Sequence, residues 1–213
     1  MGEDLKANFN SMPHPKDERT LIIIKPDGIQ RSLVGEMLSR FERIGLKITA
    51  MKMLTPTAEH IEKHYTIDPE WFKITGAKTI KSYADKGLKH PVSDDPVKVS
   101  QDILRKLKRY MTSGPVIAVV LEGAHAVPIV RKLVGSTEPL SSDVGTIRGD
   151  FMLDSYSMSN NDDRSVRNLI HASGSVDEAN KEIAFWFKKD ELMNYSHVQE
   201  KILYDVNMDG NRE

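Results

Sequence analysis

His171, at the end of a short apolar run, is the residue best placed to do chemistry in this sequence. Directly after it the chain turns through four small residues, Ala172, Ser173, Gly174 and Ser175. A neutral imidazole nitrogen carries an available lone pair, and an ordinary histidine pKa of about 6.5 leaves the ring mostly unprotonated near neutral pH. Such a nitrogen can attack a phosphorus atom, and the small residues leave room for phosphate oxygens.

A nucleophilic histidine needs an acceptor on its far ring nitrogen, and a polyphosphate needs positive charge around it. Glu182 follows about two helical turns after Ser175, so its carboxylate can fold back toward the end of the strand. Lys25, Arg131 and Arg148 are candidates to hold phosphate, because a guanidinium can bond two phosphate oxygens at once. Backbone N–H groups near Ser175 would face the same oxygens at a helix N-terminus.

Apolar runs bounded by turn residues predict the strands that must position these groups. The four predicted strands cover residues 20–24, 46–54, 116–121 and about 167–171. Apolar residues at helical spacing predict a helix from Val34 to Ile44, ended by Gly45. A second helix is expected to begin with Thr55 as N-cap and Pro56 as its first residue, and to run to about residue 65.

The second half of the chain is more polar, and its elements are harder to delimit. Residues 77–110 predict two helices separated by a loop around His90 and Pro91. We expect a polar loop over 136–149, a strand-like stretch over 150–153, and a turn-rich, mobile segment over 155–165. Ser175, with Glu178 three residues later, forms the capping-box pattern that opens a final helix.

A further helix ending at Gly135 completes the order strand, helix, strand, helices, strand, helix, strand. The long crossovers between the strands are incompatible with simple hairpins. This order predicts an α+β fold of the ferredoxin-like sandwich type, in which a four-stranded antiparallel sheet is covered by helices.

Composition restricts the class of protein. The 213 residues carry 30 basic and 31 acidic side chains, interspersed along the chain, so no overall field favours nucleic acid and we expect no specific nucleic-acid partner. There is no cysteine, which excludes disulfides and a thiol nucleophile and fits a reducing compartment. No signal-peptide h-region and no apolar stretch of membrane-spanning length are visible, so we expect a cytoplasmic protein without a membrane partner.

Several short motifs occur in one order along almost the whole chain, from Arg19 to about Tyr195. They are KPDG at 25–28, SGP at 113–115, TIRGDF at 146–151, NLIHAS at 168–173 and KEI at 181–183. Together they resemble the nucleoside diphosphate kinase family. The resemblance implies a ping-pong reaction in which the γ-phosphoryl of a nucleoside triphosphate, usually ATP, passes to His171. The resulting pros-phosphohistidine then phosphorylates a second nucleoside diphosphate.

The resemblance also implies roles for the residues around the phosphates. Lys25 and Tyr65 would assist at the transferring phosphoryl, with Lys25 also near the sugar 3′-hydroxyl. Arg131, Thr137 and Arg148 would hold the distal phosphates. Mg²⁺ would be the cofactor and would be bridged mainly by the nucleotide phosphates, without metal ligands from the protein. A homo-oligomer is also expected.

The remaining roles concern the histidine, the sugar and the base. Glu182, with Ser173 nearby, would orient and support His171, and Asn168 would contact the sugar. The base would stack on Trp71 or Phe72, of which we favour Trp71. Such stacking would accept different bases, because every base offers a face to an aromatic ring.

The sequence departs from the family pattern at four places. Ala172 stands where glycine is usual, and Gly174 replaces an aspartate, but neither change removes the nucleophile or the phosphate-binding cations. Residues 77–110 and 155–167 are longer than usual and are interpreted as insertions. We therefore divide the chain into a polar N-terminal extension (1–18), a kinase-like domain with the two insertions (19–195) and a C-terminal tail (196–213).

Parts of the sequence also fit other functions. A catalytically weak nucleotide-binding or regulatory protein could keep the same fold while its insertions serve a partner. His60 and His64, one turn apart, lack the HExxH arrangement and an obvious third metal ligand, so they predict a solvated helix face. The basic stretch at 105–110 is interpreted as a helix surface or a subunit contact. No GxxxxGK[ST] loop is present, which argues against a P-loop kinase.

Overall fold

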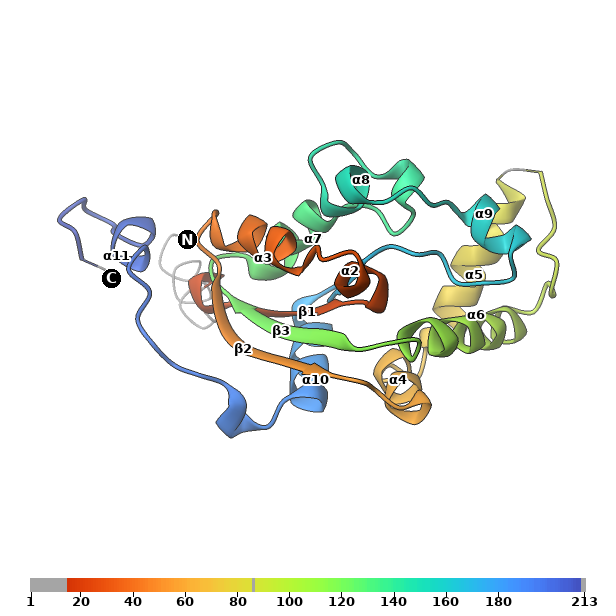
Figure 1. The fold of residues 1–213 in the computed structure, drawn as a ribbon, viewed down its shortest axis with the longest axis horizontal. Coiled ribbons are helices and arrows are strands. Elements are labelled where there is room, and N and C mark those ends of the chain that lie inside the picture. Colours follow the sequence, from red (N-terminus) through yellow and green to blue (C-terminus); the bar gives the residue numbers. More distant parts are fainter. Residues whose placement is uncertain (1–14, 86, 212–213) are drawn as a thin grey trace, which may run out of the picture.

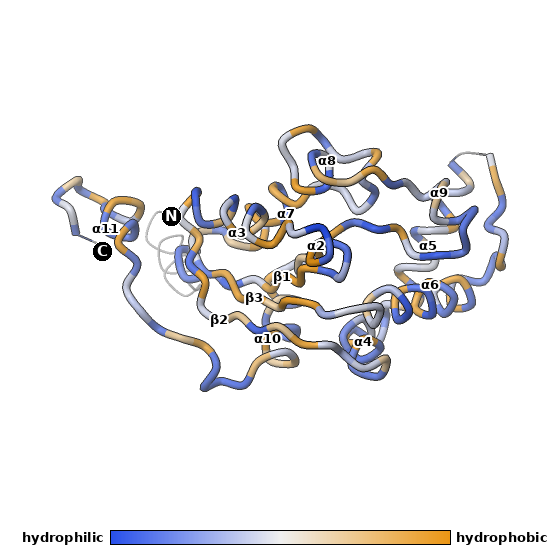
Figure 2. The backbone as a smooth tube through the Cα atoms, in the orientation of Figure 1, coloured by the Kyte–Doolittle hydropathy of each residue, from blue (hydrophilic) through white to orange (hydrophobic). Residues whose placement is uncertain are grey.

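A four-stranded antiparallel sheet forms the centre of the computed structural model, which describes residues 15–85 and 87–211. The strands lie in the order β2-β3-β1-β4 (Figure 1). Their bounds are β1 Arg19–Ile24, β2 Lys47–Leu54, β3 Val116–Glu122 and β4 Ile170–Ala172. β1 and β3 are almost wholly buried because they lie in the middle of the sheet, which explains their continuous apolar sequences (Figure 2).

Helices cover both faces of this sheet (Figure 1). On one face, α3 (Val34–Glu42) and α7 (Ala126–Val134) pack on alternate residues of the central strands. On the other face, α4 (Ala58–Tyr65) and α10 (Val176–Trp186) pack on the remaining alternate residues. The predicted α+β sandwich is therefore confirmed.

Shorter helical segments connect these layers. They are η1 Pro15–Asp17, α2 Pro26–Gln30, η2 Pro139–Ser141, α8 Ile147–Phe151, α9 Tyr156–Asn161, η3 Lys189–Glu191 and α11 Glu200–Leu203. The C-terminal tail returns to the far end of β2, where Glu200 pairs with Lys47 at 3.0 Å. Residues 1–14 of the predicted N-terminal extension lie outside the described residues. Within 15–85 and 87–211, no helix is long and apolar enough to cross a membrane.

The start of α4 corrects a predicted helix boundary. The N-cap is Thr57, whose hydroxyl accepts from the backbone N–H of His60 at 3.1 Å. Thr55 and Pro56 therefore precede the helix, and the prediction that Thr55 caps it is wrong. Two threonines flank the proline, and both residue types suit an N-cap, so spacing alone did not distinguish them.

The segment between α7 and β4 corrects two further predictions. Residues 147–151 form the helix α8 instead of continuing the loop into a strand at 150–153, because Thr146 caps this helix by accepting from Gly149 N at 3.0 Å. Ser155 caps α9 in the same way, through Met158 N at 3.2 Å, within the segment expected to be irregular. The short polar sequences concealed these helices because each is little more than one turn long.

The predicted pair of helices over 77–110 is present, but it begins earlier. α5 covers Trp71–Ala84 and α6 covers Pro96–Met111, and the loop between them includes His90 and Pro91. They pack side by side at one end of the sheet (Figure 1). α5 therefore begins at the aromatic pair expected to meet the base.

Gly76, in α5, lies where this helix meets the start of α6. A Cβ atom on Gly76 would lie 1.9 Å from the backbone oxygen of Pro96, which cannot move aside as a flexible side chain could. We expect Gly76→Ala to lower the free energy of unfolding by about 1–3 kcal/mol, although alanine favours a helix by about 1 kcal/mol over glycine. Denaturant unfolding measures the change.

The matched control is Gly35→Ala in α3, where a Cβ atom would meet nothing within 4 Å. Because only the helix propensity changes there, we expect it to stabilise by up to about 1 kcal/mol. If Gly76→Ala were as stable as this control, the close approach of α5 to Pro96 would be wrong.

Candidate active site

The edge strand β4 places His171 on the side of the sheet that faces α4 and α10. His171 is paired with Ile23 of β1, and Ile23 packs in the cluster formed with those two helices. Because paired residues of neighbouring strands point to the same face, the imidazole lies over that cluster. Its side chain is 15% exposed, so one side of the ring remains accessible.

Glu182 holds the far side of the imidazole. Its Oε1 lies 2.9 Å from His171 Nε2, and its Oε2 accepts a hydrogen bond from the Ser173 hydroxyl at 2.5 Å. Burial opposes ionisation of this carboxyl, but His171 and these hydrogen bonds lower the pKa of Glu182 to about 2. The ionised carboxylate therefore faces Nε2, while Nδ1 of His171 has no hydrogen-bond partner among the described residues.

α10 brings Glu182 to this position because the helix begins immediately after the turn. Ser175 is its N-cap and accepts from Glu178 N at 3.1 Å, as the capping pattern predicted. The Glu178 carboxylate bonds Gly174 N at 2.9 Å. The backbone and the side chain of Glu178 thus both bond the turn that follows His171.

Lys25 follows β1 and is buried beside β4. Its backbone N–H donates to Leu169 O at 2.8 Å, and its Nζ donates to Asn168 Oδ1 at 2.7 Å. Burial, and then the charge of Arg148, lower the pKa of Lys25 to about 7. This amine is therefore poised to gain a proton when a negative charge approaches.

Asn168 joins three segments of the site. Besides accepting from Lys25, its side-chain Nδ2 donates to Thr137 O at 2.8 Å, and its backbone carbonyl accepts from Arg148 Nε at 3.2 Å. Thr137 contributes its backbone carbonyl to this contact, and the residue is exposed. β4 begins only at Ile170, two residues after Asn168, so the predicted strand start at 167 is too early.

Arg148, near the start of α8, is buried and already bonded to protein. Besides Asn168 O, its guanidinium donates to Gly135 O at 3.0 Å and to Ile170 O at 2.6 Å. Burial, and then the charge of Arg131, lower the pKa of Arg148 to about 10, so it stays charged at neutral pH. These bonds use three of the five N–H groups that a guanidinium carries, which leaves two for a ligand.

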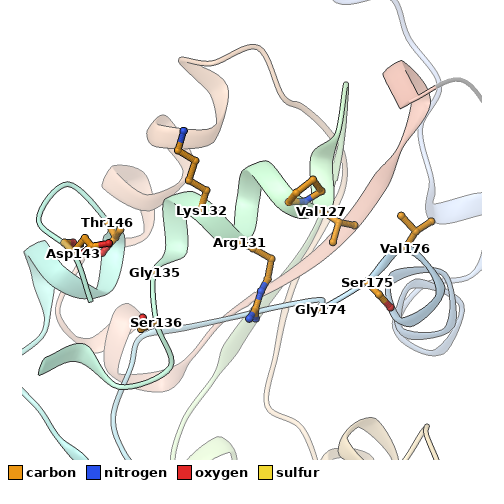
Figure 3. Close-up of a pocket in the computed structure, with 11 residues that line it drawn as sticks. Val127, Arg131, Lys132, Gly135, Ser136, Asp143, Thr146, Gly174, Ser175 and Val176 are labelled. Atoms are coloured by element: carbon orange, nitrogen blue, oxygen red, sulfur yellow. Dashed lines mark hydrogen bonds between the residues drawn. The ribbon is translucent and has the colours of Figure 1, made fainter. Parts of the chain in front are cut away.

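Arg131 approaches the histidine from α7. Its side chain points toward the turn at Gly174, whereas the neighbouring Lys132 points away (Figure 3). Its NH1 lies 3.5 Å from the Ala172 carbonyl oxygen. Arg131 also lines an open depression of about 770 Å³, which Gly174 and Ser175 border. His171 is outside this lining, so the depression lies next to the histidine and does not contain it.

Aromatic rings extend from the histidine toward α5. Tyr65 lies edge-on to His171, with ring centroids 6.3 Å apart, and Trp71 lies 6.1 Å from Tyr65. Phe72 contacts Trp71 at 5.2 Å and is one step further away. The expected cluster is therefore brought together from α4, α5, α7, α8, β4, α10 and the segments that follow β1 and precede β4, although Phe72 is at its margin.

His64 is a neighbour of the nucleophile that sequence reasoning missed. Its side chain is fully buried, and its Nδ1 accepts from Trp186 Nε1 at 3.1 Å and lies 3.6 Å from Glu182 Oε1. Its ring centroid is 4.7 Å from that of His171. Burial, and then the charge of His171, lower the pKa of His64 to about 3, so it is neutral.

The predicted solvated face over His60 and His64 is therefore wrong. His60 stacks on Phe185 with ring centroids 4.5 Å apart. The available signal was spacing, because His64 lies three residues after the buried Ile61 and so falls on the same side of the helix.

The described residues contain one group whose atoms could hold a metal ion, namely His64, His171 and Glu182 within 4.8 Å of one another. These atoms are already engaged with one another and with Trp186. Two of the three are nitrogen ligands, whereas Mg²⁺ prefers oxygen and commonly binds through substrate phosphates. This trio therefore does not suit Mg²⁺.

A family model described as nucleoside diphosphate kinase matches residues 18–72 and 67–192. The chain belongs to the nucleoside diphosphate kinase family. A nucleoside diphosphate kinase of Pyrobaculum aerophilum is 49% identical over 179 residues, covering 83% of this chain and 98% of that protein. A kinase of the same name from Archaeoglobus fulgidus is 39% identical over 188 residues, covering 88% of this chain and 98% of that protein.

Solved structures agree. The structure of the NDP kinase from Pyrobaculum aerophilum superposes with a TM-score of 0.79 at 47% identity, covering 84% of this chain and all of that one. A transition-state mimic of the kinase from Borrelia burgdorferi, with bound vanadate and ADP, gives a TM-score of 0.71 at 38% identity over 86% of this chain and 94% of that one. The enzyme is thus a nucleoside-diphosphate kinase, and the predicted resemblance and activity are confirmed over the regulatory alternative.

Proposed function

We propose that Nδ1 of His171 is the atom that carries the phosphoryl group between two nucleotides. Nδ1 attacks the γ-phosphorus of a nucleoside triphosphate, usually ATP, and the bond from that phosphorus to the β,γ-bridging oxygen breaks. The diphosphate leaves with the electron pair. A terminal oxygen of a second nucleoside diphosphate then attacks the phosphorus, the Nδ1–P bond breaks, and neutral histidine is regenerated.

The contact between Nε2 and Glu182, at 2.9 Å, is the observation that carries this proposal. A carboxylate on Nε2 keeps the proton there and leaves the lone pair on Nδ1. It also stabilises the positive charge that the ring gains when Nδ1 bonds phosphorus. Ser173, which donates to the other carboxylate oxygen, limits the rotation of Glu182.

The cations that converge on the histidine suit a polyphosphate. Lys25 and Tyr65 would act at the transferring phosphoryl, and Arg131, Thr137 and Arg148 at the distal phosphates. Phosphoryl transfer depends mainly on position and charge stabilisation, so a buried arginine held by three carbonyls is well prepared to bind without rearrangement. Mg²⁺ bound to the nucleotide would neutralise further phosphate charge.

The sugar and base would extend from the phosphates toward α5. Asn168 and Lys25 would meet the sugar, with Lys25 near the 3′-hydroxyl. Trp71 is favoured over Phe72 as the stacking platform, because its ring contacts Tyr65, which lies against His171. ADP in the kinase from Borrelia burgdorferi supports nucleotides as the ligands.

Labelling tests the covalent step. The enzyme is incubated with γ-labelled ATP and Mg²⁺, separated from free nucleotide, and chased with a different nucleoside diphosphate. We expect an acid-labile label on the protein that moves to the acceptor, and no protein label in His171→Ala. Transfer of label to the acceptor without any labelled protein would overturn the proposal in favour of direct transfer.

The pKa of Lys25 predicts proton uptake when nucleotide binds. With a pKa of about 7, Lys25 is mostly neutral at pH 8 in the free enzyme, and a phosphate beside it favours the charged form. The terminal phosphate of ADP, with an ordinary pKa near 6, is already ionised at that pH. We expect binding of MgADP at pH 8 to take up most of one proton, and the affinity to fall as pH rises above about 7.

Calorimetry in buffers of different ionisation enthalpy measures that uptake. Lys25→Met should abolish it, whereas Lys132→Met, a lysine that points away from the site, should leave it unchanged (Figure 3). Uptake that persists in Lys25→Met would assign the proton to another group.

We also propose the organisation that the sequence suggested, a kinase-like domain over 19–195 with insertions at 77–110 and 155–167 and a tail over 196–213. The two insertions contact each other, since the Asp163 carboxylate forms salt bridges with Arg105 at 3.2 Å and with Lys106 at 3.0 Å. A homo-oligomer is supported by the edge strand β2, where Met51 and Met53 are exposed. A cytoplasmic location and the lack of a specific nucleic-acid partner stay predictions.

A further inference from the structure

Tyr110, near the end of α6, contacts two residues proposed to meet the sugar. Lys25 Nζ lies 5.2 Å from the centroid of the Tyr110 ring, within the range of a cation–π interaction. The Tyr110 hydroxyl accepts from the backbone N–H of Asn168 at 3.3 Å. One side chain therefore supports the charge of Lys25 and the backbone of its partner Asn168.

The backbone at this point needs support. Leu169 has φ of 65°, a left-handed conformation that residues with a side chain rarely adopt. Such a conformation persists only where the surrounding structure holds it. Here the two successive N–H groups of Asn168 and Leu169 are held by the Tyr110 hydroxyl and by Asp27 Oδ2, the latter at 3.2 Å.

The consequence of the turn at Leu169 is the direction of Asn168. With its N–H on Tyr110 and its carbonyl on Arg148, the peptide groups on either side of Asn168 are both tied down. Its side chain is then directed between Lys25 and Thr137, which it bonds at 2.7 Å and 2.8 Å. Loss of one of the two backbone hydrogen bonds would let the Asn168 side-chain amide move away from the Lys25 amine.

Burial and a neighbouring negative charge keep the Tyr110 hydroxyl protonated. Burial, and then the charge of Asp27, raise the pKa of Tyr110 well above its ordinary value. Asp27 and Tyr110 also line the same surface pocket. The hydroxyl is thus a neutral group that can accept from Asn168 throughout the working pH range.

We propose that Tyr110 is a positioning residue for sugar recognition, which holds Asn168 and Lys25 in the arrangement that meets the 3′-hydroxyl of the nucleotide. The inference rests on the proposed function, which places these two residues at the sugar. It assigns a role to the last turn of α6, within the insertion over 77–110. Tyr110 itself acts through its two neighbours.

The test compares nucleotides with and without a 3′-hydroxyl. Tyr110→Phe keeps the ring over Lys25 and removes the tie to Asn168, so we expect kcat/KM for nucleotides with a 3′-hydroxyl to fall by about five- to tenfold. For 3′-deoxynucleotides we expect a loss of less than about twofold, because they lack the group that Asn168 and Lys25 would meet. Tyr110→Leu, which also removes the ring, should lower kcat/KM for both kinds.

Tyr83→Phe is the matched control, since this tyrosine lies on α5 and its hydroxyl contacts Asn160, away from Lys25. It should leave unchanged the ratio of kcat/KM for nucleotides with a 3′-hydroxyl to kcat/KM for 3′-deoxynucleotides. An equal loss for both kinds in Tyr110→Phe would show a merely structural role and would overturn the inference. If Tyr110→Phe does not fold, Asp27→Ala, which frees Leu169 N, is expected to reduce the same ratio.

The outcome separates this inference from the proposed function. Labelled phosphoenzyme in the wild-type enzyme, together with an unchanged ratio in Tyr110→Phe, would reject the role of Tyr110 alone. Absence of phosphoenzyme in the wild-type enzyme would reject the proposed function itself.

Discussion

Replacing His171 with alanine is expected to lower turnover by about 10⁴-fold or more, the scale of loss when a covalent nucleophile is removed. The cations and the aromatic rings remain, so nucleotide should still bind, but no ring nitrogen would face the phosphorus. Steady-state transfer from ATP to a second nucleoside diphosphate measures the loss. The control is His90→Ala, on the loop between α5 and α6, which should retain wild-type turnover.

A variant His171→Ala that kept more than about one hundredth of the activity would be incompatible with covalent transfer through this residue. Direct transfer between two nucleotides bound together would then have to be considered. Initial-rate patterns distinguish the two, because a ping-pong reaction gives parallel double-reciprocal lines.

Replacing Glu182 with glutamine is expected to lower kcat by roughly 10²-fold, comparable with the loss of one preorganised charge-stabilising group. The amide is close in shape but carries no charge, so it would not offset the positive charge of the phosphorylated ring. Because Glu182 meets His171 Nε2 and Ser173, and not the nucleotide side of the ring, the dissociation constant for ADP should change little. Pre-steady-state formation of phosphoenzyme and equilibrium ADP titration measure the two quantities.

Asp177→Asn provides the matched control, since Asp177 is an exposed acid on the same helix and pairs only with Lys181 among the described residues. Its transfer rate should stay near that of the wild type. A Glu182→Gln variant that lost transfer rate and ADP affinity in the same proportion would show that this carboxylate supports the whole site and not the ring in particular.

Long, strongly patterned elements could be predicted from sequence because one physical signal dominates each of them. β1 and β3 are continuous apolar runs in the centre of the sheet, and their observed bounds agree with the prediction to within one residue. Ser175 caps α10 as expected, since its hydroxyl is the nearest acceptor for the free N–H of Glu178. That cap also explains why Glu182 could be assigned to His171.

Predictions of short elements were wrong where several local signals competed. Thr57, and not Thr55, caps α4, and α8 and α9 are each close to a single turn, so their apolar periodicity is too short to read. The left-handed Leu169 carries no sequence signal, because its conformation is imposed by Asp27 and Tyr110 from distant segments. Such a contact is invisible until the chain is folded.

The sequence predicted which residues would gather at the candidate site, but not the contacts that support them. Arg148 was expected as a phosphate ligand, yet it also ties together three carbonyls around β4. His64 was assigned to a solvated face, although it is buried beside Glu182 and its ring packs against that of His171. In both cases the missing information is tertiary packing.

Nuclear magnetic resonance of the isolated phosphoenzyme tests most directly which atom of His171 carries the phosphoryl group. The ring signals and the ³¹P shift distinguish phosphorylation at Nδ1 from that at Nε2. With Nε2 bonded to Glu182 at 2.9 Å, we expect one phosphoryl group on Nδ1, discharged on addition of a nucleoside diphosphate. Phosphorus on Nε2, or on a residue other than His171, would contradict the proposed mechanism.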